Sequence, residues 1–231
     1  FFLNINYGDG GVYLKEFFIN ITEIGDSFWF FSICLIFPII IYLNKKIGFL
    51  ILKQSDKLII FFISSFIYIL TTGLVTQIIK HVIGRPRPNH ADFESKVDLN
   101  FFTLESSYHS FPSGHSSTIF IVCLILGATF LKLKYFFYLF AFIVAISRVV
   151  VGAHFITDVI AGGLIALIIF KSLNIIMDKK YKSFSFLEYV FKEDLQVYNF
   201  VIFLTAVSLL LTVGPSLDLY ISSLFYLGDS Q

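Results

Sequence analysis

The sequence predicts an all-α fold, a polytopic membrane helix bundle that forms one domain over residues 1–231. Hydrophobic residues make up 57% of the chain and charged residues only 14%. Soluble domains carry about 25% charged residues, so this composition argues against a soluble globular enzyme. It also excludes intrinsic disorder, which requires low hydrophobicity and high net charge. In addition, apolar runs recur along the chain at close to the roughly 20 residues that a bilayer-crossing helix needs.

Six apolar runs are the expected spans, because each contains at most two charged residues. They cover residues 27–43, 58–79, 116–131, 135–153, 157–177 and 195–217. Pro38 would break a soluble helix, but a membrane bundle can accommodate the kink. Residues 11–25 alternate apolar and polar side chains at roughly helical spacing, which predicts a helix lying flat on the outer surface; residues 183–194 suggest the same on the inner surface.

The distribution of lysine predicts the orientation of the bundle. Most of the 17 Lys and Arg residues fall in three places: the loop 44–57, the short loop that joins the third and fourth spans, and the segment from Lys171 onward. These positions share one face, which the positive-inside rule assigns to the cytoplasm. We therefore expect a bacterial inner-membrane protein whose opposite face meets the periplasm. Six spans place both ends outside, so residues 1–3 are expected to be the end of a truncated seventh span.

Three polar clusters fall at the predicted outer face. They read KHVIGRPRP over residues 80–88, SFPSGH over residues 110–115 and SRVVVGAHFITD over residues 147–158. Lys80, Arg87 and Arg148 would repel one another unless an anion lay between them. Arginine matches phosphate oxygens in bidentate fashion and lysine supplies a point charge. The clusters therefore predict a binding site for an anion such as phosphate.

The second and third clusters add donors and reactive groups. Ser113 and Gly114 open a helix, whose first backbone N–H groups have no intrahelical partner and favour an anion. His154 and Asp158 are four residues apart and share a helix face, so the carboxylate can fix the imidazole tautomer and leave Nε2 as a nucleophile. His115 lies at the rim, where it can protonate a leaving oxygen. The pattern predicts phosphoryl transfer through a phosphohistidine.

The pattern K-x6-R-P, P-S-G-H and S-R-x5-H-x3-D resembles the type-2 phosphatidic acid phosphatase superfamily. The resemblance covers residues 80–158 in motif terms and implies that His154 is the nucleophile, oriented by Asp158, with His115 as general acid. It also implies that phosphate is bound by Lys80, Arg87, Ser113, Gly114 and Arg148. His81 and Arg85 lie outside the minimal pattern and receive no role, and His90 and His109 are interpreted as loop residues.

No cofactor or metal is expected, because no Cys/His or Asp/Glu set has ligand spacing. Cys34 and Cys123 both lie within apolar runs and make no disulfide framework. The net charge of +1 gives no indication of a nucleic-acid partner. The expected partners are the bilayer and a membrane lipid, either a phospholipid or lipid A.

The leading functional interpretation is a lipid phosphatase acting at the periplasmic face. Lipid A 1-phosphate is the first candidate substrate, because the short segment 89–111 and the FPSGHSS block resemble bacterial lipid A 1-phosphatases. A phosphatase of broad specificity for phosphatidylglycerophosphate, phosphatidic acid or undecaprenyl pyrophosphate is the alternative, and a phosphotransferase stays open. An anion or lipid transporter is disfavoured because transporter sites usually lie at the midplane. A vanadate-dependent haloperoxidase is disfavoured by the spans.

Overall fold

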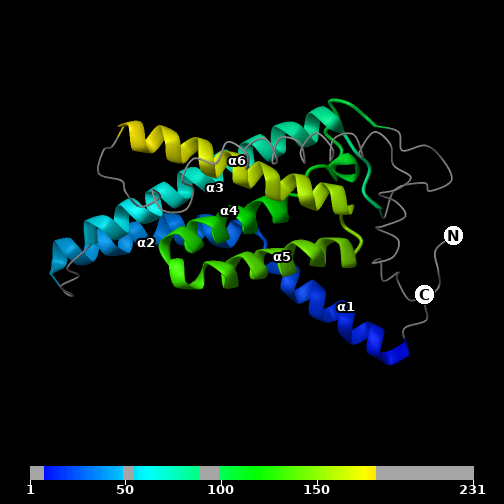
Figure 1. Ribbon diagram of the computed structural model, residues 1–231, viewed down its shortest axis with the longest axis horizontal. Coiled ribbons are helices and arrows are strands. Elements are labelled where there is room, and N and C mark those ends of the chain that lie inside the picture. Colours follow the sequence, from blue (N-terminus) through cyan, green and yellow to red (C-terminus); the bar gives the residue numbers. More distant parts are fainter. Residues whose placement is uncertain (1–7, 49–54, 89–98, 181–231) are drawn as a thin grey trace.

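The computed structural model describes residues 8–48, 55–88 and 99–180, and this part of the chain folds as a bundle of α-helices (Figure 1). The helices are α1 (Gly8–Glu23), α2 (Ser27–Ile47), α3 (Ser55–Ile83), α4 (Gly114–Thr129), α5 (Lys134–Val150) and α6 (Ile156–Lys180). Short 3-10 turns, η2 (Ser106–Tyr108) and η3 (Leu131–Leu133), precede α4 and α5. No strand occurs within the described ranges, which confirms the all-α prediction.

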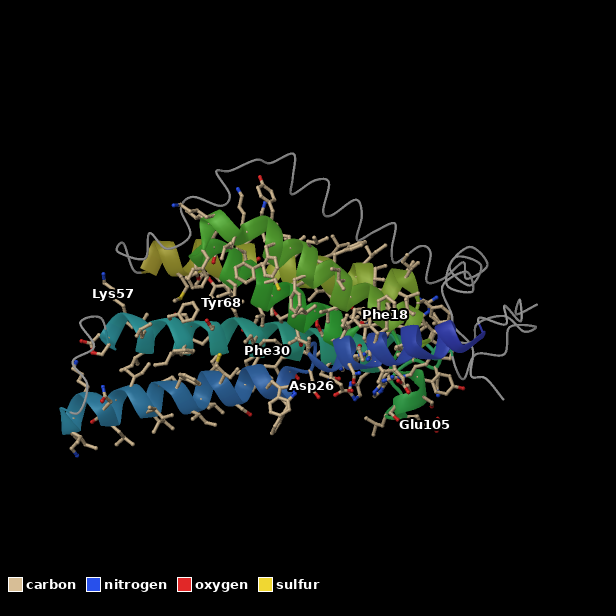
Figure 2. All side chains as sticks on the ribbon, turned by 90° about the horizontal axis from the view of Figure 1, so that it is seen from below. Phe18, Asp26, Phe30, Lys57, Tyr68 and Glu105 are labelled. Atoms are coloured by element: carbon tan, nitrogen blue, oxygen red, sulfur yellow. The ribbon has the colours of Figure 1, made fainter. Side chains whose placement is uncertain are left out.

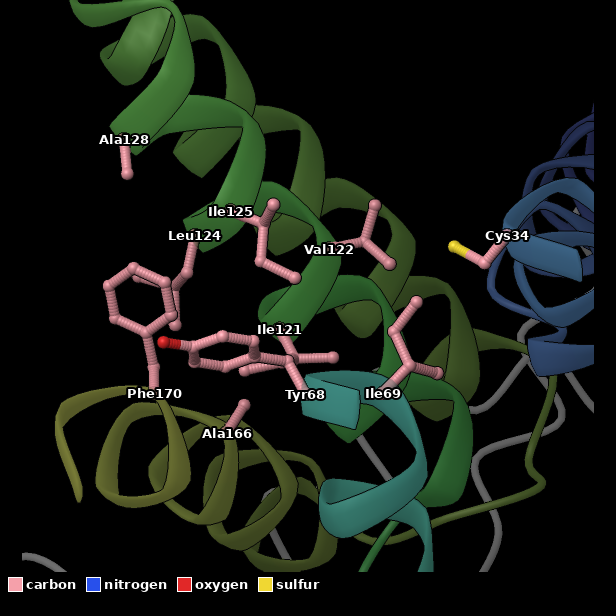
Figure 3. Packing of buried hydrophobic residues seen from close by; sticks show 10 residues of the cluster. All are labelled: Cys34, Tyr68, Ile69, Ile121, Val122, Leu124, Ile125, Ala128, Ala166 and Phe170. Carbon is pink, nitrogen blue, oxygen red and sulfur yellow. The ribbon is translucent and has the colours of Figure 1, made fainter. Parts of the chain in front are cut away.

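Helix α4 lies at the centre of the bundle and contacts α2, α3, α5 and α6. Its buried side chains, together with Tyr68 and Ile69 of α3 and Phe170 of α6, form the main hydrophobic cluster (Figure 3). By contrast, α2 buries only Cys34 and Ile41. It exposes large side chains such as Trp29 and Ile39, each 59% accessible. An apolar surface of this extent suits contact with lipid.

The described helices confirm most of the predicted spans in position but not their number. Four stretches are long and apolar enough to cross a membrane: Glu16–Ile47, Ser55–Ile83, Leu131–Val150 and Ile156–Met177. Helix α4, at 16 residues, is about 24 Å long and shorter than a typical hydrocarbon core. Its neighbours enclose it, so it need not match the bilayer by itself. The predicted span 195–217, like residues 183–194, lies outside the described residues.

The two ends of the bundle differ in chemistry, as the sequence predicts. At one end, Lys45 of α2 pairs with Asp56 of α3 at 2.7 Å, and Lys132 and Lys134 lie at the turn between α4 and α5. Figure 2 shows Lys57 at this end and Glu105 at the other. The motif residues belong to the end that carries Glu105. Which end faces the cytoplasm stays a prediction.

Helix α6 approaches the start of α4 closely because residue 162 is glycine. A Cβ atom at Gly162 would lie 2.6 Å from the carbonyl oxygen of Ser113, closer than real Cβ atoms come. The Ser113 N–H in turn donates to the carbonyl oxygen of Asp158 at 2.9 Å. The absence of a side chain at Gly162 therefore allows α6 to pack directly against the start of α4.

Gly162→Ala is therefore expected to destabilise the protein by about 1–3 kcal/mol, the usual cost of overpacking, because the new methyl group meets backbone atoms. Thermal unfolding of the detergent-solubilised protein measures this. Gly73→Ala is the matched control, since a Cβ at Gly73 of α3 would meet no atom of the described residues within 4 Å apart from its own stretch of helix. An unchanged melting temperature for Gly162→Ala would show that α6 can move away from α4.

Candidate active site

The three polar clusters meet at one end of the bundle. Lys80 lies on the last turn of α3, Ser113 caps α4 and Arg148 lies on the last turn of α5. His154 occupies the turn between α5 and α6, and Asp158 lies in the first turn of α6. Lys80 lies within electrostatic range of Arg87, Arg148 and Asp158. The structure thus brings together the residues that the sequence predicts for the site.

The segment after α3 is held against the segment before α4 by backbone hydrogen bonds. Arg87 N–H donates to the Ser107 carbonyl at 2.9 Å, and Ser110 N–H donates to the Arg85 carbonyl at 3.0 Å. Gly84 makes the turn possible with a φ of 56°, a left-handed conformation that favours glycine. A Cβ there would lie 1.7 Å from the carbonyl oxygen of Asn100. These contacts bring the first two motifs side by side.

Ser113 and Gly114 form the start of α4 beside Lys80. The Ser113 side chain accepts hydrogen bonds from the Ser116 backbone N–H at 3.4 Å and the Ser116 hydroxyl at 2.9 Å. Its own hydroxyl proton therefore stays available as a donor. A Cβ at Gly114 would lie 3.7 Å from Cε of Lys80, so the lysine stem passes over this position. Helix N–H groups, a hydroxyl and an ammonium group are thus gathered where an anion would bind.

Arg148 is positioned by a residue that the motifs do not include. Its Nη1 donates to Thr22 Oγ1, near the end of α1, at 2.8 Å. Its Nε atom is buried and has no hydrogen-bond partner among the described residues. A buried donor of this kind suits an anionic ligand, because an unsatisfied buried polar group is costly. The turn between α1 and α2 also contacts His115, since a Cβ at Gly25 would lie 3.2 Å from the His115 Cβ.

Arg87 lies at the edge of the site and is half-buried. Its Nε donates to the Ser106 carbonyl at 3.3 Å, a long hydrogen bond between a charged donor and a neutral acceptor. Asp158 and Lys80 both lie within range of its charge. Arg87 is therefore placed to add positive charge to the same anion site.

His154 is buried, and its tautomer is fixed differently from the expectation. The sequence predicted that Nδ1–H donates to Asp158, but Nδ1 lies 2.8 Å from the Ser110 carbonyl oxygen and 3.6 Å from Oδ2 of Asp158. A carbonyl can only accept, so Nδ1 carries the proton and Nε2 keeps its lone pair. Burial, with help from Lys80 and Arg148 and against the opposing effect of Asp158, lowers the pKa of His154 to about 3. The ring is thus neutral near pH 7.

Asp158 is fully buried, and its shortest contacts are with groups other than His154. Oδ1 accepts from Arg85 Nη1 at 2.6 Å. Oδ2 accepts from the Ser110 hydroxyl at 2.5 Å and from the Phe155 backbone N–H at 2.9 Å. Arg85, to which the sequence assigned no role, is therefore the ion-pair partner of this carboxylate.

Sequence reasoning missed three contributors, namely Thr22, Arg85 and Ser110. Arg85 and Ser110 stand within the first two polar clusters, but the motif pattern assigned a role to neither of them. Thr22 lies outside all three clusters and carries no local signal. The roles of all three depend on contacts with residues far along the chain. His109 contributes only its backbone carbonyl oxygen, to which Lys80 Nζ donates at 2.8 Å.

Comparison with known proteins agrees with this geometry. The model of the PAP2 superfamily matches residues 61–182. A lipid A 1-phosphatase of Rhizobium etli is 31% identical over 155 residues, which cover 64% of this chain and 65% of that protein. The chain thus spans just under two thirds of that relative's length. The phosphatidylglycerophosphatase B of Bacillus subtilis is 31% identical over 169 residues, 68% of this chain and 72% of its own.

A solved structure is similar as well. The crystal structure of a transmembrane PAP2 type phosphatidylglycerolphosphate phosphatase from Bacillus subtilis superposes with a TM-score of 0.50. The two chains are 27% identical, and the alignment covers 74% of this chain and 80% of the other.

Thr22→Val is expected to weaken vanadate binding about three- to tenfold. The variant removes the hydrogen bond that orients Arg148, and such a bond contributes about 1 kcal/mol. Thermal stabilisation of the solubilised protein by vanadate measures the affinity. Thr71→Val is the control, since the Thr71 hydroxyl donates to the Ile67 carbonyl within α3 and has no other hydrogen bond to the described residues. Equal vanadate affinity in the Thr22 variant and the unaltered protein would show that Thr22 does not position Arg148.

Proposed function

The chain belongs to the PAP2 superfamily, and from this premise we propose that it is a membrane lipid phosphatase that removes a phosphate from a lipid headgroup. The observation that carries the proposal is the buried His154, whose Nδ1 lies 2.8 Å from the Ser110 carbonyl oxygen and whose ring lies within electrostatic range of Lys80 and Arg148. Relatives named for lipid A and phosphatidylglycerophosphate support a lipid substrate.

In the proposed reaction, His154 Nε2 attacks phosphorus while the bond from phosphorus to the lipid oxygen breaks. His115 donates a proton to the departing oxygen, which leaves as the lipid alcohol. Water then attacks the phosphohistidine and gives its proton to His115, and inorganic phosphate and neutral His154 are released. Lys80, Arg87 and Arg148 stabilise the charge on the transferring phosphoryl group. The Ser113 hydroxyl and the Gly114 end of α4 bind its oxygens.

The site is proposed to face the periplasm of a bacterial inner membrane. The support is the clustering of lysines at the opposite end of the bundle. Single cysteines at positions 44 and 100, in a background lacking Cys34 and Cys123, would report the orientation. An impermeant reagent that labels position 44 but not position 100 of intact cells would reverse it.

Lipid A 1-phosphate is the leading candidate substrate, with a broader specificity for phosphatidylglycerophosphate, phosphatidic acid and undecaprenyl pyrophosphate as the alternative. We expect the purified protein to release phosphate fastest from lipid A in detergent micelles. The rate should be unchanged in EDTA, because the three cations replace a metal at the phosphate. Loss of activity in EDTA that a divalent ion restores would contradict this mechanism. Equal rates on all four lipids would favour the broader enzyme.

Substitutions of the two histidines should have different effects on the reaction. His154→Ala is expected to abolish turnover and the covalent phosphoenzyme. His115→Ala should slow hydrolysis of a lipid phosphate by ~10²–10⁴-fold, the usual size of general acid catalysis. Nitrophenyl phosphate should partly rescue His115→Ala, because its leaving group needs no proton. Asp158→Asn should fall between the two.

Mass spectrometry after a brief exposure to substrate detects the phosphohistidine. His81→Ala is the control. Among the described residues this ring hydrogen-bonds to the Gln77 carbonyl one turn back in α3 and packs against the His109 ring. Neither ring has a role in the proposed reaction, so the variant should retain turnover near that of the unaltered protein. Phosphate found on His115, or rescue of His154→Ala by nitrophenyl phosphate, would reverse the two roles.

A further inference from the structure

We propose that Arg85 is a positioning residue that holds Asp158 as its own ion-pair partner and so keeps His154 a neutral nucleophile. This inference rests on the proposed function, in which His154 attacks phosphorus. Arg85 lies outside the minimal motif pattern.

Arg85 is built into the protein interior. Its side chain is 0% exposed. Its Nη1 donates to Oδ1 of Asp158 at 2.6 Å and to Thr157 Oγ1 at 2.8 Å. Its Cζ lies 4.0 Å from the centroid of the Phe155 ring, a cation–π arrangement. All these partners lie at the start of α6, so Arg85 is fixed to the element that carries Asp158 and is turned away from solvent.

Arg85 and His154 both lie beside the Asp158 carboxylate, but Arg85 is much closer to it. The distance from Arg85 Nη1 to Oδ1 is 2.6 Å, whereas His154 Nδ1 lies 3.6 Å from Oδ2. Oδ2 is already bonded to the Ser110 hydroxyl and the Phe155 N–H. His154 Nδ1 bonds instead to the Ser110 carbonyl. The oxygen nearer to His154 thus already accepts two hydrogen bonds, and the imidazole has a neutral acceptor of its own.

This arrangement has a direct chemical consequence. A buried carboxylate without a cationic partner favours the charged form of an adjacent imidazole. A protonated imidazole has no lone pair on Nε2 and cannot attack phosphorus. The other charged groups facing His154 are Lys80 from α3 and Arg148 from α5, and Arg87 acts on Lys80 from the segment after α3. His115 faces the site from α4. Arg85 alone among these groups bonds to Asp158 in the described structure.

Arg85 and Arg87 therefore differ in role although only one proline separates them. Arg87 is half-buried at the edge of the site and bonds to the Ser106 carbonyl. Arg85 is enclosed and bonds to Asp158. Arg87→Gln thus serves as the matched control for Arg85→Gln, since both changes remove one positive charge from the same short segment.

The experiment measures His154 protonation by NMR of ¹³C-labelled histidine in the solubilised protein, with His154→Ala providing the assignment. In the unaltered protein, His154 should stay neutral over the range from about pH 5 to 8. In Arg85→Gln, its titration midpoint should rise by roughly two units or more, because Asp158 loses its partner. This readout needs no turnover, so it tests the inference even if the lipid assay fails and the proposed function is wrong.

Kinetics provide the second readout. In Arg85→Gln, the fall of kcat/KM on the acid side of its pH profile (the acid limb) should move to higher pH. The inhibition constant for inorganic phosphate should stay within about threefold of that of the unaltered protein. Arg87→Gln should weaken phosphate inhibition by roughly tenfold and leave the acid limb in place. Arg85→Lys should restore part of the loss, because a cation again faces Asp158.

The double variant Arg85→Gln/Asp158→Asn guards against misfolding of the single variant, since it leaves no buried charge unpaired. If Arg85 acts through Asp158, the His154 midpoint of the double variant returns to the range of the unaltered protein. An unchanged His154 titration in Arg85→Gln would overturn the inference. The inference would also be overturned if the His154 midpoint of the double variant were as high as that of Arg85→Gln. The same holds if Arg85→Gln, like Arg87→Gln, weakened phosphate inhibition and left the acid limb in place.

Discussion

The site depends on one buried carboxylate. Asp158 accepts hydrogen bonds from Arg85, from the Ser110 hydroxyl and from the Phe155 backbone N–H. Through these three donors it joins the segment after α3, the segment before α4 and the first turn of α6. Truncating one partner of such a buried pair leaves an uncompensated charge in the interior. The relative positions of the three motifs therefore depend on this ionised side chain.

Positive charge is the second constraint. Lys80, Arg87 and Arg148 act on one another through a poorly hydrated region at the end of the bundle. They are kept together by neutral backbone and hydroxyl oxygens: Lys80 donates to the His109 carbonyl and Arg148 to Thr22. Neutral acceptors orient the cations without cancelling their charge, which leaves the field of the cluster available to a phosphate group.

The sequence predicts the positions of the helices well, because a long apolar run indicates a segment that is buried in lipid or in protein. It predicts their ends less well. Helix α3 continues to Ile83 and carries Lys80 on its last turn, beyond the predicted end at residue 79. Helix α5 stops at Val150, because the chain turns at Gly152, with a φ of 71°, and brings His154 to the site. The motifs identify the candidate residues, but the Ser110 acceptor, Arg85 and Thr22 depend on tertiary contacts without a sequence period.

The close fit of Gly162 against Ser113 also bears on how the protein is made. Helices α3, α4 and α5 precede α6 along the chain, so Lys80, Arg85 and Arg148 leave the ribosome before Asp158 does. Until α6 enters the bundle, Arg85 lacks its carboxylate, and the start of α4 lacks the backbone acceptor at Asp158. Biogenesis therefore has an order: the Arg85–Asp158 ion pair and the backbone hydrogen bond from Ser113 form only when α6 has docked.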